Sequence, residues 1–221
     1  MMRLAVLASG EGTNLEAVAA AIEAGRLAAE VAIVVCDRAG AGAIARAKAH
    51  GLACALIERR AHAGRDAHER AILAAVAAAG GADLGVLAGY MRIAGSVLRA
   101  APWPLINLHP SLLPSFPGMH AVEQALAAGV RVTGCTVHFV DAGVDTGPII
   151  AQRAVAVREG DSAQGLTRRI HRAEHRLLPE VLSLFAAGRV RLEGRRVRIA
   201  GPARARAPAR GAGRYHSRAG G

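Results

Sequence analysis

The sequence lacks several features that would place it in common classes of protein. Its three cysteines are odd in number and form no CxxC pair, which excludes a disulfide framework and a cysteine zinc site. No apolar run reaches the roughly 18 residues that a membrane helix needs. The N-terminus carries one positive charge and reaches Glu11 quickly, unlike a secretion signal. These absences favour a reduced, cytoplasmic compartment and predict no association with a membrane.

Lysine and aromatic residues are also scarce. Only Lys48 accompanies the arginines, and aromatic residues make up 3% of the chain. The formal net charge of +11 is concentrated in residues 186–221, where ten arginines face one acid, so the rest of the chain carries only +2. A surface that binds nucleic acid would interleave aromatic residues with the arginines, and here none occurs before Tyr215. We therefore interpret this arginine-rich C-terminal tail as a solvated, disordered extension. Nucleic acid is disfavoured as a partner.

Two alternating periodicities predict the fold of the first half. Short, nearly continuous apolar runs are typical of strands buried on both faces, and they lie at 3–8, 31–36, 54–57, 84–88 and 105–108. Helical segments at 14–24, 41–50 and 65–79 separate them, each followed by glycine. This alternation predicts a doubly wound α/β fold with a mostly parallel sheet and helices on both faces.

The pattern changes after Val130. Long strands at 132–140 and 149–157, joined by a short acidic loop, predict an antiparallel pair near one side of the sheet. A helix over 162–187 and a short basic hairpin follow. We expect one domain over residues 1–200, large enough to bury a substantial core, and a basic extension over 201–221.

The loop after the first strand, residues 9–15, has the composition of an anion site. Its small residues let a helix begin sharply, with free N–H groups that attract negative charge. The loop has neither the third glycine of a dinucleotide motif nor the lysine of a triphosphate loop. It therefore predicts either a site for a single phosphate or a merely tight turn.

The densest signal is the segment 105–118. Asn107 and His109 are two residues apart on a predicted strand, so their side chains share one face. Three prolines stiffen the loop that follows. This pattern favours a catalytic site over a buried structural histidine, and His138, on a neighbouring strand, is a further candidate to line it.

Acidic residues supply partners for this site. Either Asp145 or Asp141, both in loop 140–148, could orient His109 and raise its pKa. Glu174 falls inside the apolar stripe of the last helix. A buried carboxylate is costly without a cation, so Glu174 predicts either an arginine partner or the amine of a ligand.

Other titratable residues carry weaker signals. No spacing of His, Asp and Glu matches a metal site. The histidines predicted to lie on the surface are His62, His68, His175 and His216.

Taken together, four segments resemble those of the phosphoribosylglycinamide formyltransferases. The segments are LASGEGTN at 7–14, LAGYMRI at 87–93, INLHPSLLPSFPG at 106–118 and VDTGPII at 144–150. Their order and spacing extend the resemblance from residue 2 to about residue 190. The resemblance implies a formyltransferase domain over residues 1–200 and leaves the basic tail outside it.

The resemblance also implies roles for individual residues. The catalytic residues would be Asn107, His109 and Asp145. The residues that bind the substrate would be Gly12, Thr13 and Asn14 at its phosphate, Glu174 at its amine, and His171, where many relatives carry a polar amide-type residue. The residues that contact folate would be Arg65, Met91, Arg92, Ile93, Ala94, Asn107, Asp141, Ala142, Gly143, Val144 and Asp145.

The implied reaction transfers the formyl group of 10-formyltetrahydrofolate to the amine of glycinamide ribonucleotide in purine synthesis. Asn107 and protonated His109 would stabilise the oxyanion, and Asp145 would help to relay the proton. The expected partners are these two small molecules, with no metal, and the expected protein is a monomer or homodimer.

Three alternatives remain from the sequence. A formyltetrahydrofolate deformylase has the same Asn, His and Asp core but transfers the formyl group to water, and it normally carries a further N-terminal domain. Methionyl-tRNA formyltransferases have a similar SLLP loop, but continue into a C-terminal tRNA-binding domain. The last alternative is a basic nucleic-acid-binding protein on an inactive enzyme fold.

Overall fold

The computed structural model describes residues 1–92 and 94–201, and its centre is a seven-stranded sheet in the order β3-β2-β1-β4-β5-β6-β7. The strands are β1 (Met2–Ala8), β2 (Ala29–Cys36), β3 (Cys54–Leu56), β4 (Leu84–Leu87), β5 (Leu105–His109), β6 (Val132–Phe139) and β7 (Ile149–Ala156). The first five pair in parallel, whereas β6 and β7 are antiparallel to their neighbours. The predicted mostly parallel α/β fold is confirmed, with strand ends that differ by one or two residues.

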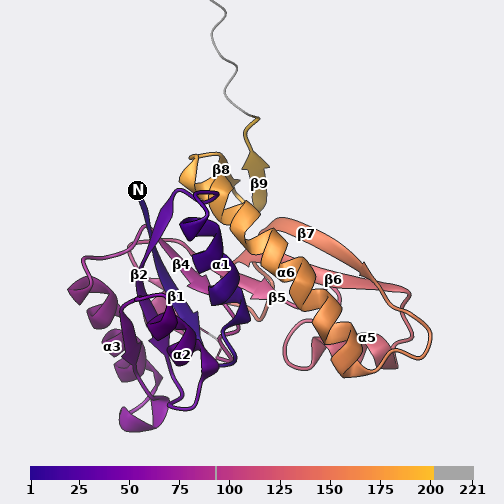
Figure 1. Cartoon of the computed structure of the whole chain (residues 1–221), viewed down its shortest axis with the longest axis horizontal. Coiled ribbons are helices and arrows are strands. Elements are labelled where there is room, and N and C mark those ends of the chain that lie inside the picture. Colours follow the sequence, from indigo (N-terminus) through magenta and orange to yellow (C-terminus); the bar gives the residue numbers. More distant parts are fainter. Residues whose placement is uncertain (93, 202–221) are drawn as a thin grey trace, which may run out of the picture.

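Helices cover both faces of the sheet (Figure 1). One face carries α1 (Thr13–Glu23), α2 (Gly42–Ala49), α5 (Ala121–Ala127) and α6 (Ala163–Ala186), and the other carries α3 (Arg65–Ala78) and α4 (Ser96–Arg99). A short 3₁₀ helix, η1 (Arg59–Ala61), precedes α3. The sequence did not predict α4, α5 or η1, because elements of three to seven residues give little periodicity and depend on tertiary packing.

The central strand β1 shows why the sheet needs cover on both sides. Successive side chains point to opposite faces, so Leu4 and Val6 join the core under α1 and α6, whereas Ala5 and Leu7 join the core under α3. All four side chains are buried. The burial explains the nearly continuous apolar runs of the parallel strands.

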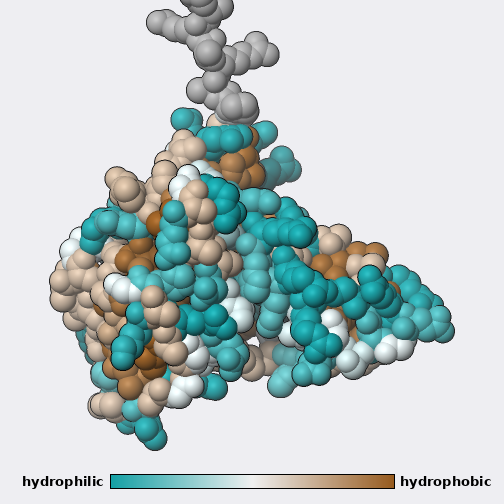
Figure 2. Space-filling model, in the orientation of Figure 1, coloured by the Kyte–Doolittle hydropathy of each residue, from teal (hydrophilic) through white to brown (hydrophobic). Residues whose placement is uncertain are grey.

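The last helix has one apolar and one charged side. Its predicted stripe is buried against the sheet and consists of Leu166, Ile170, Ala173, Leu177 and Val181. Arg168, Arg172 and Arg176 are exposed on the other side, which gives the hydrophilic surface along α6 in Figure 2. Among the described residues, no helix combines the length and apolar character required of a membrane span.

The predicted basic hairpin follows α6. It consists of β8 (Val190–Glu193) and β9 (Arg196–Ile199), which pair only with each other as a second, two-stranded sheet. In Figure 1 the hairpin lies beyond the C-terminal end of α6. The predicted disorder of the tail falls on residues 202–221, outside the described part of the chain.

Candidate active site

A cavity of 390 Å³ opens at the edge of the sheet where β4 and β5 end. Most of the predicted site residues line it, namely Asn14, Met91, Arg92, Ala94, Asn107, His109, Asp141, Gly143, Val144, Asp145, His171 and Glu174. Four others do not, namely Gly12, Thr13, Arg65 and Ala142. The predicted residue Ile93 lies outside the described residues. The fold therefore gathers two helices, two loops and the strand β5 around one cavity, at the position where open α/β sheets bind ligands.

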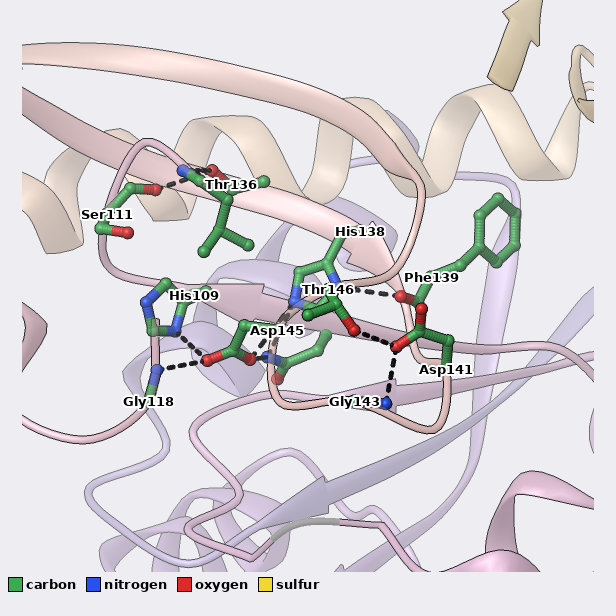
Figure 3. Close-up of polar contacts among 12 residues, drawn as sticks. His109, Ser111, Gly118, Thr136, His138, Phe139, Asp141, Gly143, Asp145 and Thr146 are labelled. Carbon is green, nitrogen blue, oxygen red and sulfur yellow. Dashed lines mark hydrogen bonds and ion pairs between the residues drawn. The ribbon is translucent and has the colours of Figure 1, made fainter. Parts of the chain in front are cut away.

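His109 pairs with Asp145 rather than Asp141. His109 Nδ1 lies 3.2 Å from Asp145 Oδ2 (Figure 3). Asp141 instead accepts hydrogen bonds from the Thr146 hydroxyl at 2.6 Å and the Gly143 N–H at 3.1 Å. The structure thus decides between the two carboxylates that the sequence left open.

The Asp145 carboxylate has several donors. The Gly118 N–H donates to Oδ2 at 2.8 Å, and Asn107 Nδ2 donates to Oδ1 at 3.2 Å. Burial opposes ionisation, but the contacts with His138 and the Gly118 N–H and the charge of His109 outweigh it, so the pKa of Asp145 lies below its ordinary value. The carboxylate is therefore ionised at neutral pH.

His109 is held at both ring nitrogens. Its Nε2–H donates to the Phe116 carbonyl oxygen at 2.8 Å, so Nδ1 can donate to Asp145 only when the ring is doubly protonated. Burial lowers the pKa of His109 below its usual value, despite the opposing effects of Phe116 and Asp145. Asp145 raises the pKa of His109, as predicted, but burial outweighs this effect and the net shift is downward. A histidine that releases its proton this readily suits a relay.

Asn107 is oriented by two acceptors. Its Nδ2 lies 3.2 Å from His138 Nε2 and 3.2 Å from Asp145 Oδ1. His138 Nδ1 lies 2.8 Å from the Phe139 carbonyl oxygen, which requires the proton on Nδ1 and leaves Nε2 free to accept. The Asn107 amide therefore has internal partners for both of its N–H groups, and a ligand oxygen must compete for them.

The proline-rich loop is fastened to β6 and β7. The Thr136 hydroxyl donates to the Ser111 carbonyl at 2.7 Å (Figure 3). Gln152 donates to the Leu113 carbonyl at 2.8 Å, and the Ser111 hydroxyl donates to the Ser115 carbonyl at 2.5 Å. These bonds fix the loop that presents the Phe116 carbonyl to His109 and the Gly118 N–H to Asp145.

Backbone strain marks the same place. Among the described residues, positive φ angles outside glycine occur at Phe116 (55°), His120 (61°) and Asp145 (55°). Phe116 bonds His109, and the other two residues line the cavity. Each such conformation costs about 1–3 kcal/mol, and these costs concentrate at functional sites. The strain independently supports a functional role for this cavity.

Glu174 lies at the other end of the cavity. Its side chain is buried, and Asn14 Nδ2 donates to Oε2 at 3.0 Å. The predicted arginine partner is not found among the described residues, where the ion pairs involve other acids. Burial raises the pKa of Glu174, because the bond from Asn14 and the charge of His171 do not offset the loss of hydration.

Asn14 adds a second acceptor beside that carboxylate. Its Oδ1 is buried and has no hydrogen-bond partner in the described part of the chain. Such an orphaned acceptor is unusual in a folded protein. A group that only donates hydrogen bonds, such as an amine, satisfies both Asn14 Oδ1 and Glu174.

The predicted anion loop lies directly before α1. Gly12 has a φ of 73° and packs so closely on α2 that a Cβ would lie 2.6 Å from Ala43 Cα. Thr13 and Asn14 are the first residues of the helix, where backbone N–H groups have no acceptor within the helix. Because Asn14 also reaches Glu174, this helix start adjoins the amine-accepting end of the cavity.

The chain around the predicted folate residues Met91, Arg92 and Ala94 is held from α3 and from the residue that follows β2. Glu69, buried on α3, accepts from the N–H groups of Gly95 and Leu98. Arg92 forms an ion pair with Asp37. Arg65 does not line the cavity, but its Cδ would lie 2.6 Å from a Cβ on Gly95, so its side chain packs against Gly95.

Three lining residues lie outside every segment that the sequence singled out, and other residues were misplaced. Met119, His120 and Ala121 line the cavity, and only the adjoining Gly118 gave a signal. His68 was predicted on the surface but is buried, with Nε2 donating to the Ile57 carbonyl at 2.9 Å. Helical spacing alone did not show which face of α3 is covered. His62 and His175 are partly buried, and His216 lies outside the described residues.

The described residues contain no group of three or more His, Cys, Asp or Glu side chains able to hold a metal ion. The chemistry that this arrangement offers consists of a histidine–carboxylate pair, an oriented amide and, across the cavity, a buried acid with too few donors.

Comparisons with known proteins agree with this geometry. Residues 2–182 match the family model described as formyl transferase. The chain is 43% identical over 183 residues to phosphoribosylglycinamide formyltransferase of Bacillus subtilis, covering 82% of this chain and 93% of that protein. It is 45% identical over 194 residues to the Mycobacterium tuberculosis protein of that name, covering 87% and 89%. The crystal structure of glycinamide ribonucleotide transformylase 1 from Symbiobacterium toebii superimposes with a TM-score of 0.87 at 49% identity, covering 90% of this chain and 94% of that one.

Proposed function

Since this chain belongs to the formyl transferase family, we propose that its cavity transfers the formyl group of 10-formyltetrahydrofolate to the amine of glycinamide ribonucleotide. The similar proteins carry this activity in their names and match the chain over most of its length. The transfer forms a bond between the amine nitrogen and the formyl carbon, breaks the bond from that carbon to N10 of the folate, and moves one proton from the amine to N10.

The observation that carries the choice of acceptor is the pair Glu174 and Asn14. A buried carboxylate with one neutral donor and an adjacent amide oxygen without a partner form a site for a group rich in N–H donors. The phosphate of the same substrate would bind at the start of α1, through Gly12, Thr13 and Asn14. His171 lines the cavity one helical turn from Glu174 and would face the same molecule.

The catalytic roles belong to Asn107, His109 and Asp145. The attacked formyl oxygen becomes an oxyanion, which N–H donors from Asn107 and protonated His109 would stabilise. Because Asp145 is ionised and lies 3.2 Å from His109 Nδ1, it favours the protonated ring during the relay. Asn107 would give up one of its hydrogen bonds to His138 or Asp145 and donate to the oxyanion instead.

The folate would lie between the two loops at the far side of the catalytic residues. One loop supplies Met91, Arg92, Ile93 and Ala94, with Arg65 beside it, and the other supplies Asp141, Ala142, Gly143 and Val144. Exposed apolar side chains on both loops, at Met91 and Val144, suit the flat ring system of a folate.

The reaction can be tested by following folate absorbance with purified protein and 10-formyltetrahydrofolate, with and without glycinamide ribonucleotide. We expect tetrahydrofolate to form only when the ribonucleotide is present. Rapid formation without it would favour the deformylase instead. A folded protein that is inactive under both conditions would contradict both activities.

The cell compartment and the oligomeric state are also part of the proposal. The odd cysteine count without a paired motif supports a reduced compartment, the cytoplasm. All the groups of the proposed mechanism come from one chain, so a monomer and a homodimer are both compatible with it. Light scattering coupled to size exclusion would distinguish them.

A further inference from the structure

The basic hairpin after α6 reaches the loop that carries Asp145. Gly194 (φ 60°) and Arg195 form the two-residue turn between β8 and β9, where Glu193 pairs with Arg196. A glycine with positive φ at the first position of such a turn suits the twist of a hairpin. The turn thereby places the Arg195 side chain at the tip of the hairpin, beyond both strands.

The Arg195 guanidinium contacts the active-site loop at two points. Nη2 donates to the Thr146 carbonyl oxygen at 2.6 Å, and Nη1 lies 3.5 Å from Asp141 Oδ2. Thr146 directly follows Asp145, and its hydroxyl bonds the same Asp141 carboxylate. One planar cation therefore joins the two ends of the segment 141–146, using the forked geometry for which arginine is suited.

The loop itself is tightly built but is not closely packed on the hairpin. A Cβ on Gly143 would lie 2.0 Å from the Thr146 hydroxyl oxygen, and a Cβ on Gly147 would lie 1.7 Å from the Phe139 carbonyl oxygen. Between the loop and the hairpin lies a cavity of 730 Å³, so the two elements are not closely packed there. Among the described residues, the hydrogen bond and ion pair that join the loop to the hairpin both come from Arg195.

We propose that Arg195 is a positioning residue for the transfer reaction, holding the segment 141–146 so that Asp145 keeps its place beside His109 and Asp141 keeps its place at the folate end of the cavity. This role rests on the proposed function. It concerns a residue beyond the matched family region, which ends at residue 182, and it acts through Thr146 and Asp141 rather than on a reacting atom.

The strained conformation of Asp145 explains why the contacts of Arg195 with the loop matter for the site. Asp145 has a φ of 55°, which a non-glycine residue holds only when its surroundings enforce it. The Gly118 N–H fixes its side chain, and Arg195 fixes the peptide that follows it. Loss of the latter contact lets the backbone relax and takes the carboxylate away from His109, Asn107 and Gly118.

The test compares Arg195→Ala and Arg195→Lys with the wild type. For Arg195→Ala we expect kcat to fall about three- to tenfold, since a charge-assisted hydrogen bond is lost at a largely exposed site. The KM for 10-formyltetrahydrofolate should rise and that for glycinamide ribonucleotide should not change. Arg195→Lys should restore part of the activity, because an ammonium can replace one of the two contacts.

The matched control is Arg191→Ala, which removes an exposed arginine from β8 of the same hairpin and should leave all constants unchanged. The acidic limb of the kcat profile should move to higher pH in Arg195→Ala, since Asp145 moves away from the groups that lower its pKa. A merely structural loss would lower the active fraction without moving this limb or separating the two KM values.

Hydrogen exchange of the backbone amides at 141–147 supplies a readout that does not depend on turnover. Faster exchange in Arg195→Ala than in Arg191→Ala is expected, and equal exchange would overturn the proposal. Equal kinetics of Arg195→Ala and Arg191→Ala would overturn it as well. A wild type without transferase activity would instead contradict the proposed function, while the exchange experiment still decides whether Arg195 holds the loop.

Discussion

The two acids that line the cavity, the partly buried Asp145 and the buried Glu174, have opposite surroundings. Asp145 receives hydrogen bonds from Gly118 and Asn107 and faces two histidines, and its pKa lies below the ordinary value. Glu174 receives one bond, from Asn14, and its pKa lies above the ordinary value. The first is a carboxylate that the protein has already satisfied, and the second is one that the protein has left for a ligand.

This difference distinguishes a catalytic acid from a binding acid. A carboxylate that orients a histidine must remain charged and fixed in position when no substrate is bound. Its hydrogen-bond donors therefore belong to the protein. A group that recognises an amine gains selectivity when its donors are missing, because ligands without the amine leave it unsatisfied. Four experiments separate the two roles, beginning with the largest effect.

Removal of the catalytic pair should cost most. Asp145→Asn or His109→Ala should lower kcat by about 10²–10⁴-fold, the usual contribution of positioned acid–base groups. Steady-state kinetics with both substrates measures this loss, and circular dichroism checks the fold. Asp83→Asn, an exposed acid next to β4, is the control and should behave as wild type. Near-normal activity in either catalytic variant would contradict the assigned mechanism.

Neutralising the binding acid should act mainly on the ribonucleotide. We expect Glu174→Gln to lower kcat/KM for glycinamide ribonucleotide roughly 10–100-fold, because one partner of a buried charged contact is lost. The KM for 10-formyltetrahydrofolate should stay the same. Glu180→Gln, on the exposed side of α6, provides the matched control. In the wild type, ribonucleotide affinity should fall as pH drops through the raised pKa of Glu174, and an unaltered profile in Glu174→Gln would argue against this role.

Substitution of His138 should have an intermediate effect, and only on kcat. His138→Ala removes the acceptor that holds one N–H of Asn107, and a lost hydrogen bond of this kind corresponds to about a tenfold fall in kcat. Affinity for the ribonucleotide, measured by calorimetry, should not change. A change in that affinity with unchanged kcat would mean that the two ends of the cavity are not independent.

The smallest effect is on stability, where the two acids should differ in sign. The folded-state pKa of Glu174 is raised, so its contribution is fully present below the ordinary pKa of 4.5 and is lost as pH rises through the folded value. The folded-state pKa of Asp145 is lowered, so its contribution is present above 3.8 and is lost as pH falls through the folded value.

At neutral pH, therefore, Glu174→Gln should raise the melting temperature of the ligand-free protein and Asp145→Asn should lower it. A change of 1 kcal/mol corresponds to about 2–4 °C for a chain of this size. Scanning calorimetry without substrates measures both shifts. Shifts of the same sign in the two variants would show that the surroundings of the acids do not differ as described.

The sequence predicted those features that repeat along the chain. Strand and helix positions followed from the alternation of apolar runs with helical segments, and buried Glu174 followed from its place in the stripe of α6. Asn107 and His109 were placed together because two residues on a strand share a face. All these inferences use neighbours within one element.

Features that depend on several elements could not be predicted in this way. The choice of Asp145 over Asp141 depends on where loop 140–148 folds over β5, and the net pKa of His109 depends on how deeply it is buried. Arg195 lies in the predicted basic hairpin, but it contacts a carbonyl 49 residues away, which composition and local periodicity could not indicate. Strand periodicity contains no information about such distances.

The bond between Asn14 and Glu174 joins residues 160 positions apart, which has a consequence for the growing polypeptide. Ribosomes add about 5–20 residues per second, so Asn14 at the start of α1 is made roughly 8–32 seconds before its partner Glu174. During that interval β1 and its flanking helices can assemble, but the amine-accepting end of the cavity does not yet exist. In a nascent chain of this protein, the capacity to recognise an amine can therefore arise only once α6 has been made and has docked beside α1.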